Sequence, residues 1–496
     1  MSLQFITGNS GNGKTKYLFN RIVKEAKANP RDNYLVIVPE QFTMQTQRQL
    51  VDLSENKAIM NIDVLSFKRL AYRVFDELGI TNLTVLEETG KNLVLRKLAA
   101  QEADKLGVIG RNLNRIGYIS EVKSLLSELV QYNISPEELG RYIASGKSSD
   151  TLSDKLKDVL VLYEAFEKFM QDKYITAEEI LNVLSNVAEE SAILRNSVIA
   201  FDEFTGFTPI QNQLIKKLFV ISKKIYVTLT IDCREDIFKS RGMQELFDMP
   251  KRTVKSLTEM AAFYGIEVEE PIILDKNYRL AENEELSFME QQFFRKRRCS
   301  FKKVPKHIHI DCLRDPKQEL TKIARRINEL VRNENLRYRD IAIVTGDVNI
   351  YAGYVREIFD KYNIPYFIDA TQEILFHPFI EFIRSIPDIA AQNFSADAVF
   401  RFLRCGFSEL LDSEIDVLEN YVLACGVRGK SAWDKKWVRL PKHKAGYDIE
   451  LLNQSREYIM ELLKPVYQVF SDKKSTVKDY VLAIYKLIVL LDIPDK

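Results

Sequence analysis

Residues 8–15 of this chain read GNSGNGKT, and this segment constrains the fold more than any other. It matches G-x-x-x-x-G-K-[ST], the P-loop that surrounds nucleotide phosphates. Residues 3–7 (LQFIT) predict a short buried strand before it, and residues 16–28 predict a helix after it. Strand, glycine loop and helix are the setting that the motif needs, which favours a phosphate site over a chance glycine-rich turn.

The P-loop residues have distinct expected roles. Glycine allows backbone N–H groups to come close to the phosphates, and the helix N-terminus adds a positive partial charge. Lysine is expected to reach the β- and γ-phosphates of ATP, and the threonine hydroxyl to help hold Mg²⁺. The residues concerned are Gly8, Gly11, Gly13, Lys14 and Thr15.

Composition limits the class of protein. The 496 residues suffice for about three or four domains, and the net charge of +1 gives no overall attraction to nucleic acid, so any DNA site must be a local patch. No apolar run approaches the ~18 residues of a membrane span, and the first strand begins too early for a signal peptide. The five cysteines form no C-x-x-C pair, which favours a reducing, cytoplasmic location.

The order of predicted elements indicates tandem α/β domains with helical insertions. Further strands are predicted at 33–39, 62–65, 197–201 and 224–231, and capping boxes at Ser135, Thr176 and Thr208 mark helix starts. A second α/β pattern follows, with strands at 307–312, 340–345 and 365–369 and helices at 317–332 and 351–362. The predicted fold is two RecA-like domains, each with a helical insertion, the second truncated. The boundaries are 1–84 and 195–294 for the first RecA-like domain, 85–194 for its insertion, 295–306 for a basic linker, 307–377 for the second RecA-like domain and 378–496 for its insertion.

Two segments outside the P-loop are candidates for the same site. Asp202 and Glu203 directly follow the strand 197–201, and a P-loop ATPase needs a carboxylate at the end of a neighbouring strand. Asp202 is expected to hold Mg²⁺ and Glu203 to orient the attacking water, unless the two are an acidic pair in a loop. Tyr278 could stack on adenine and Arg279 could touch the γ-phosphate; a plain surface loop is the alternative.

The loops after the second and third strands predict contacts with single-stranded DNA. Gln41 and Thr43 can hydrogen-bond to base edges, whereas Phe67 and Tyr72 can stack on bases and Arg69 can pair with phosphate. Core packing of Phe67 and Tyr72, with Gln41 capping a helix, is the alternative. The basic stretch 295–306 is equally compatible with a DNA contact and with a solvated linker.

Taken together, the motifs resemble a known family. The order of P-loop, Asp-Glu, Asn-Tyr-Arg and RDIAIV resembles UvrD-like superfamily 1 helicases. The phrases VPEQFT, LSFKRLAY, DEFTGFTPIQ and HPFIEFIRS resemble the amino-terminal portion of the AddB family, whose members pair with AddA in AddAB helicase–nucleases. The resemblance covers essentially the whole chain.

This resemblance implies an AddA-like partner that carries the main motor, and processing of duplex DNA ends for recombination. It also implies that the present half is a degenerate motor that scans single-stranded DNA for a hotspot sequence (Chi), with Gln41, Thr43, Phe67, Arg69 and Tyr72 along the DNA path. Tyr72 departs from the tryptophan expected there. Residues 232–234 lack the Gly-Asp and Gln of active helicases. The family's nuclease and its iron–sulfur cluster are expected only in a carboxy-terminal part beyond this chain.

Three functions remain open from the sequence. They are a DNA-scanning, ATP-binding component of a helicase–nuclease, an active helicase, and a P-loop regulatory module that does not touch DNA. The chain stops at Lys496 within the second predicted insertion, before the arginine that would complete the ATPase cleft. We therefore expect a fragment with an incomplete second sheet, weak ATP hydrolysis and no nuclease activity.

Overall fold

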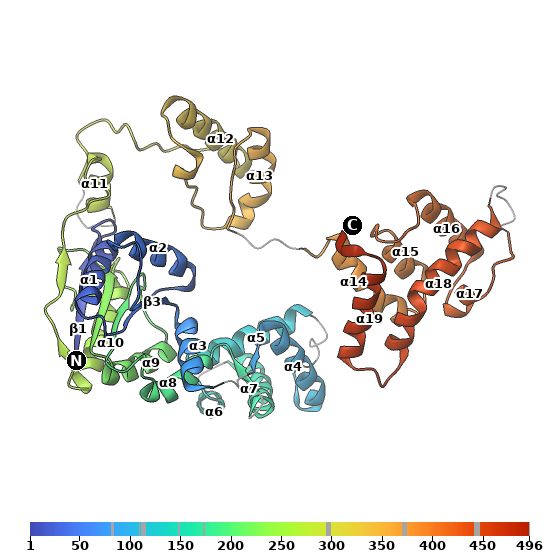
Figure 1. Cartoon of the computed structure of the whole chain (residues 1–496), viewed down its shortest axis with the longest axis horizontal. Helices are drawn as coiled ribbons and strands as arrows, with labels where there is room; N and C mark the ends of the chain where they lie inside the picture. The colour runs from blue at the N-terminus through green and yellow to red at the C-terminus, as the bar shows by residue number, and fades with distance from the viewer. Residues whose placement is uncertain are drawn as a thin grey trace. The chain divides into compact units, whose positions relative to one another are not determined.

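The structure is a computed structural model that describes residues 1–80, 84–108, 110, 116–146, 149–171, 174–293, 299–369, 374–440 and 447–495. It contains two compact units, Met1–Ile310 and Asp311–Lys496 (Figure 1). None of the helices in these ranges is long and apolar enough to cross a membrane.

A parallel sheet forms the centre of the first unit, which confirms the predicted α/β fold. Its order is β3-β2-β6-β7-β1-β8, and β9 also pairs with β1. Because every one of these strand pairs is parallel, the carboxyl ends of the strands lie along one edge. The strands are β1 (Ser2–Gly8), β2 (Tyr34–Ile37), β3 (Ile62–Leu65), β6 (Val198–Phe201), β7 (Lys224–Thr230), β8 (Glu267–Val268) and β9 (Ile272–Leu274).

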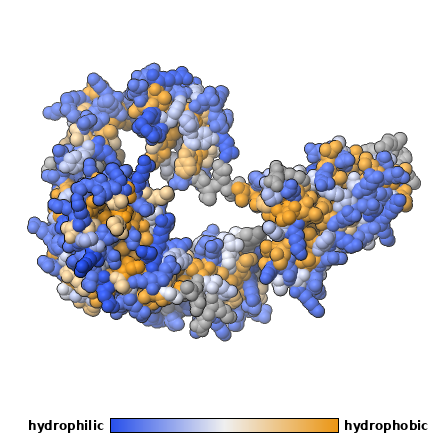
Figure 2. Space-filling model, viewed as in Figure 1, coloured by the Kyte–Doolittle hydropathy of each residue, from blue (hydrophilic) through white to orange (hydrophobic). Residues whose placement is uncertain are grey.

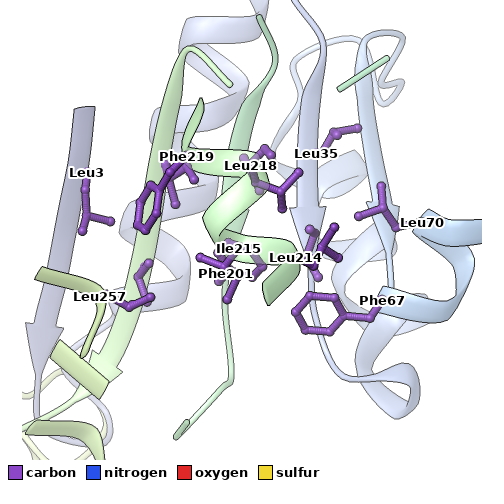
Figure 3. Close-up of a cluster of buried hydrophobic side chains, with 14 of the residues drawn as sticks. Leu3, Leu35, Phe67, Leu70, Phe201, Leu214, Ile215, Leu218, Phe219 and Leu257 are labelled. Atoms are coloured by element: carbon purple, nitrogen blue, oxygen red, sulfur yellow. The ribbon is translucent and has the colours of Figure 1, made fainter. Parts of the chain in front are cut away.

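Helices cover both faces of this sheet. Alternate strand residues face opposite ways, so Leu35 and Ile37 pack with α3, α8, α9 and α10, whereas Tyr34 and Val36 pack with α1 and α2. Figure 3 shows part of the first of these cores. The helices are α1 (Lys14–Ala28), α2 (Thr43–Leu53), α3 (Phe67–Leu78), α8 (Ile180–Val187), α9 (Pro209–Ile221), α10 (Asp248–Phe263) and α11 (Glu284–Gln292).

The helical insertion has a core of its own. Strands β4 (Val85–Leu86) and β5 (Ile175–Thr176) form a small parallel pair where the insertion begins and ends. Helix α8 lies inside the boundaries predicted for the insertion, yet Ile180 and Leu184 belong to the core of the main sheet. The insertion's helices are α4 (Glu88–Gln101), α5 (Ile116–Gln131), α6 (Pro136–Ala144) and α7 (Asp150–Met170).

The predicted capping boxes are present where the chain enters helices. Thr208 accepts from the backbone N–H of Gln211, whose side chain accepts from the Thr208 N–H. Ser135 accepts from the Glu138 N–H at the start of α6. These contacts satisfy backbone donors that a helix leaves unpaired at its first turn, so residues close in the chain determine where these helices begin.

The second unit begins with two helices that the sequence predicted, α12 (Pro316–Asn333) and α13 (Val348–Lys361). The three strands predicted at 307–312, 340–345 and 365–369 are wrong, because these described residues form no strand. A strand needs a hydrogen-bonded neighbour to persist, and parallel pairing needs several together. The apolar side chains instead border a hollow of about 820 Å³, and Val344 and Phe367 are 93% and 89% exposed. Figure 2 shows apolar surface on this part of the chain.

The rest of the second unit is helical, as predicted. Its core is built around Phe382, Trp433 and Ile459, which are fully buried. The helices are α14 (Pro378–Ala391), α15 (Ala396–Leu403), α16 (Asp412–Cys425), α17 (Lys430–Asp434), α18 (Ile449–Ser471) and α19 (Val477–Leu490).

Candidate nucleotide site

Glycine is required where the P-loop turns from β1 into α1. Gly11 and Gly13 have φ of 90° and 80°, the left-handed region that side chains with a Cβ rarely adopt. A Cβ on Gly11 would also lie 2.7 Å from Asn277 Oδ1 and 2.8 Å from Arg279 Cβ. The loop therefore depends on glycine both for its conformation and for the close approach of residues 277–279.

Lys14 lies at the start of α1 with its ammonium group over the P-loop. Its Nζ donates to the carbonyl oxygens of Gly8, at 3.1 Å, and Asn9, at 3.0 Å. Burial lowers the pKa of Lys14, while Glu203 and Asp202 act in the opposite direction. The group contacts no apolar core, so its position serves the concave side of the loop, where a phosphate would bind.

Asp202 supplies a buried carboxylate at the end of β6. Its side chain is in a residue only 1% exposed; Oδ1 accepts from Thr228 Oγ1, and Oδ2 has no hydrogen-bond partner among the described residues. Burial, followed by the nearby charge of Glu203, raises the pKa of Asp202. An unpartnered buried carboxylate oxygen beside a phosphate loop fits a Mg²⁺ site, because Mg²⁺ prefers oxygen ligands and would favour the ionised form.

The expectation that Asp202 follows a strand next to the P-loop strand needs correction. Strand β7 lies between β1 and β6 and pairs with both. The carboxylate still faces the site because all three strands end at the same edge and Thr228 of β7 bridges to it. The order of strands along the chain could be predicted, but their order in the sheet could not.

Glu203 adopts a left-handed backbone conformation, with φ of 65°. For a residue other than glycine this conformation costs on the order of 1 kcal/mol or more and persists where the surroundings impose it. The Glu203 carboxylate accepts a hydrogen bond from Thr15 Oγ1 at 3.3 Å. The turn therefore directs both acidic residues at the start of α1, where the sequence placed them.

Residues 277–279 lie against the outside of the P-loop, after β9. The Tyr278 N–H donates to Gly11 O at 3.0 Å, Asn277 Nδ2 donates to Ser10 O at 3.0 Å, and Arg279 is 3.4 Å from Ser10 Oγ. The Tyr278 residue is 65% exposed, and its ring lies beside Gly13. The structure thus brings Tyr278 and Arg279 to the phosphate loop and leaves an aromatic face open.

Two asparagines at variable positions of the motif were missed by the sequence reasoning. Asn9 accepts from the Cys233 N–H at 3.1 Å and donates to Glu290 of α11 at 2.6 Å. Asn12 donates to Leu274 O at 2.5 Å. The repeated carboxamides were the available signal, because these side chains can bind backbone groups of neighbouring loops.

Comparison with known proteins agrees with this geometry. A family model described as "ADDB, N-terminal" matches residues 5–290. The chain belongs to the AddB family.

Curated AddB relatives carry a name that makes each of them one of the subunits of an ATP-dependent helicase/deoxyribonuclease. Those from Lachnoclostridium phytofermentans and Clostridium tetani are 38% and 32% identical over the whole chain, which corresponds to 44% of each relative. The one from Clostridium novyi is 32% identical over 88% of the chain and 38% of the relative. The chain therefore spans less than half the length of these AddB proteins.

The five residues expected along the AddB DNA path divide into exposed and buried groups. Gln41, Arg69 and Tyr72 are exposed, and Tyr72 is 39% exposed with its ring beside Phe75. Arg69 pairs with Glu40 at 2.9 Å, and Glu40 also accepts from Ser66, so the loops after β2 and β3 are joined. These three side chains remain available to a ligand.

For Phe67 and Thr43 the structure favours the core interpretation. Phe67 is 7% exposed and packs among Phe201, Phe204 and Phe207 at centroid distances of 5.8, 5.6 and 6.4 Å (Figure 3). Thr43 is 4% exposed and donates to Glu40 O at 3.0 Å. The expected DNA contacts of both are corrected, because neither presents a free side chain. Helix periodicity decides this: Phe67 starts α3 on its inner face, and Arg69 and Tyr72 lie on another face.

The basic linker is described only in part. Residues 294–298, with four of the predicted cations, lie outside the described residues. Among the remainder, Lys302, Lys303 and Lys306 are exposed. Lys303 pairs with Glu284, and the Lys306 N–H donates to Glu285 at 2.7 Å. This portion contacts the acidic first turn of α11, which agrees with a linker and leaves a DNA contact untested.

Proposed function

We propose that this chain is the ATP-binding and DNA-scanning part of an AddB protein within an ATP-dependent helicase/deoxyribonuclease. The observation that carries the proposal is the meeting of the P-loop, Asp202, Glu203 and residues 277–279 at one edge of the parallel sheet. The name of the AddB relatives supports the enzyme class.

The residues fit Mg-ATP as follows. The backbone N–H groups of residues 8–15 and Lys14 bind the phosphates, Thr15 and Asp202 hold Mg²⁺, and the Tyr278 ring stacks on the base. Bound Mg²⁺ neutralises charge on the phosphates. Glu203 orients water, and Arg279, held beside Ser10, approaches the γ-phosphate.

The exposed residues after β2 and β3 support a single-stranded DNA path. Tyr72 offers a ring for base stacking, Gln41 offers a carboxamide, and Arg69 offers a guanidinium that can exchange Glu40 for a phosphate. Within the family proposal, this path scans for a Chi sequence while an AddA-like partner processes broken duplex ends.

An active helicase and a regulatory module without DNA contact are less favoured. Residues 232–234 hold a buried Asp232 bound by Arg234 rather than a free polar pair, which supports weak coupling of ATP to DNA. The exposed Gln41, Arg69 and Tyr72 favour a DNA contact over a purely regulatory role.

Titration of the chain with a fluorescent ATP analogue and Mg²⁺, followed by ATPase assays with and without single-stranded DNA, tests the proposal. We expect saturable Mg-dependent binding, weak hydrolysis, and DNA binding that strengthens on co-expression with an AddA-like protein. Robust DNA-stimulated turnover by this chain alone would instead identify a motor. Lack of single-stranded DNA binding, alone and with the partner, would identify a regulatory module.

A further inference from the structure

A basic segment connects α16 to α18 in the second unit. Residues 428–440, which we call the basic strap, pass through the short helix α17 (Figure 1). The strap carries a single carboxylate, Asp434, and five cations: Arg428, Lys430, Lys435, Lys436 and Arg439. Charge runs are usually solvated surface, so the strap requires a second observation before it suggests a ligand.

That observation is the way in which the strap is fastened to the bundle. Its two tryptophans, Trp433 and Trp437, are buried, at 0% and 7% exposure. Asn453 of α18 accepts from the Trp437 N–H and donates to the Trp437 carbonyl oxygen, both at 2.9 Å. Arg456 of α18 donates to Trp433 O at 2.9 Å.

The same fastening continues to the end of the strap, where the Tyr421 hydroxyl donates to Arg439 O at 2.7 Å. Asn453 and Arg456 are only 5% exposed. Burial of a guanidinium and a carboxamide is unfavourable unless their hydrogen bonds are made, and these bonds hold non-helical backbone in one conformation. The exposed side chains of the strap are therefore presented from a rigid support.

The strap cations also differ from the other cations of this bundle. Arg401 pairs with Glu381 and Asp388, and Arg404 pairs with Asp416 and Glu419. In the strap, Lys430 pairs with Asp434. For the other four, Arg428, Lys435, Lys436 and Arg439, the described part of the bundle provides no ion pair, and all four are exposed.

We propose that the basic strap binds the phosphate backbone of DNA, as a second contact outside the nucleotide-binding unit. The identity of the ligand as DNA rests on the proposed function; the binding surface rests on the strap itself. An acidic protein is the less suitable partner, because protein interfaces are depleted in lysine and use exposed aromatic anchors. Here the aromatic residues face inward and lysine and arginine face outward, which fits sequence-independent phosphate binding.

The test compares two charge-matched variants of the full chain. The first replaces Arg428, Lys435, Lys436 and Arg439 with Gln. The control replaces the exposed Lys464, Lys473, Lys474 and Lys478 of α18, α19 and their connection with Gln. Fluorescence anisotropy with labelled duplex and single-stranded oligonucleotides over a series of salt concentrations gives affinity and salt dependence.

We expect the strap variant to lose roughly 10- to 100-fold in affinity. Its salt slope should fall by about 0.9 for each lost duplex phosphate contact, or about 0.7 for single strands, and the arm with the larger loss identifies the form bound. The control should match the wild type. Equal losses in both variants, or no change in the strap variant, would overturn the proposal.

Two further arms separate this proposal from the others. If Arg69→Gln with Tyr72→Ala weakens binding and the strap variant does not, the strap proposal fails alone; the reverse result removes the DNA path of the first unit instead. Absence of DNA binding by the wild type contradicts both. If poly-glutamate binds the wild type as tightly as DNA and the strap variant loses both alike, the strap is a surface for acidic protein and the DNA proposal is overturned.

Discussion

Asp202 and Lys14 are groups of opposite charge whose pKa values burial shifts toward the neutral forms. The pKa of the carboxyl is raised and that of the ammonium is lowered, and in both cases loss of solvent is the largest cause. Groups held in this way cost stability in the free protein and gain when a charged ligand arrives. This pattern agrees with a ligand site and not with a structural ion pair.

Lys14→Ala tests the phosphate contact. Hydrogen bonds to charged groups contribute about 1.5–3 kcal/mol each, so loss of Lys14 should weaken ATP binding on the order of 100-fold or more. Titration with the fluorescent ATP analogue measures the change, and circular dichroism checks the fold. Lys16→Ala, an exposed neighbour on the same helix, is the matched control. Unchanged ATP affinity in folded Lys14→Ala would overturn the site.

Asp202→Asn tests the buried carboxylate through pH. The raised folded pKa means that the folded state binds the proton more tightly than the unfolded chain, whose value is near 3.8. The stabilising contribution of this group is therefore full below about pH 3.8 and is lost as pH rises through the folded value. We expect Asp202→Asn to have a higher free energy of unfolding than the wild type at pH 7, with the difference shrinking toward pH 4.

Urea denaturation at several pH values measures this difference. The same variant should lose Mg-dependent strengthening of nucleotide binding, because an amide is a poorer Mg²⁺ ligand than a carboxylate. A variant that is less stable than the wild type at every pH, with unchanged Mg²⁺ dependence, would assign Asp202 to structure alone.

At the scale of the element, α3 serves two purposes on different faces. Phe67 closes the aromatic cluster beneath the sheet, whereas Arg69 and Tyr72 face outward beside the loop after β2. The helix is fixed at its start by Ser66, which accepts from the Arg69 N–H and also contacts Glu40. Packing thus holds the outward residues in place for a ligand.

Phe67→Ala and Tyr72→Ala should separate these two purposes. We expect Phe67→Ala to lower the free energy of unfolding by about 3–5 kcal/mol, as for other buried phenylalanines, with little effect on DNA affinity in the folded protein. We expect Tyr72→Ala to leave stability nearly unchanged and to weaken single-stranded DNA binding by ~1–3 kcal/mol. Denaturant titration and anisotropy decide between them, and a reversed pattern would restore Phe67 to the DNA path.

At the scale of the whole molecule, the nucleotide site lies within one unit. The P-loop, Asp202, Glu203 and residues 277–279 all belong to Met1–Ile310. The strap belongs to Asp311–Lys496. The two proposed binding activities are therefore separable.

Residues 1–310 produced alone should bind Mg-ATP with the affinity of the whole chain, within about threefold, because no contact of the described site comes from the second unit. Calorimetric titration of both proteins gives the comparison, with the Lys14→Ala form of each as the negative control. A loss of tenfold or more in a folded 1–310 protein would show that the second unit contributes to the site.

Local patterns in the sequence determined much of the first unit. The P-loop, the alternating strands and the capping residue Thr208 each specify structure through neighbours in the chain, and each was found where predicted. The acidic pair and residues 277–279 were also identified, since side chains at the carboxyl ends of parallel strands meet at one edge.

Contacts between distant residues decided the rest. Only the tertiary structure placed β7 between β1 and β6, moved α8 into the core of the sheet and turned Phe67 inward. It also showed that residues 340–345, although apolar and β-branched, form no strand, because a strand exists only with a hydrogen-bonded neighbour. Residue spacing records what one segment prefers, whereas strand order, burial and pairing depend on which other segments are present to meet it.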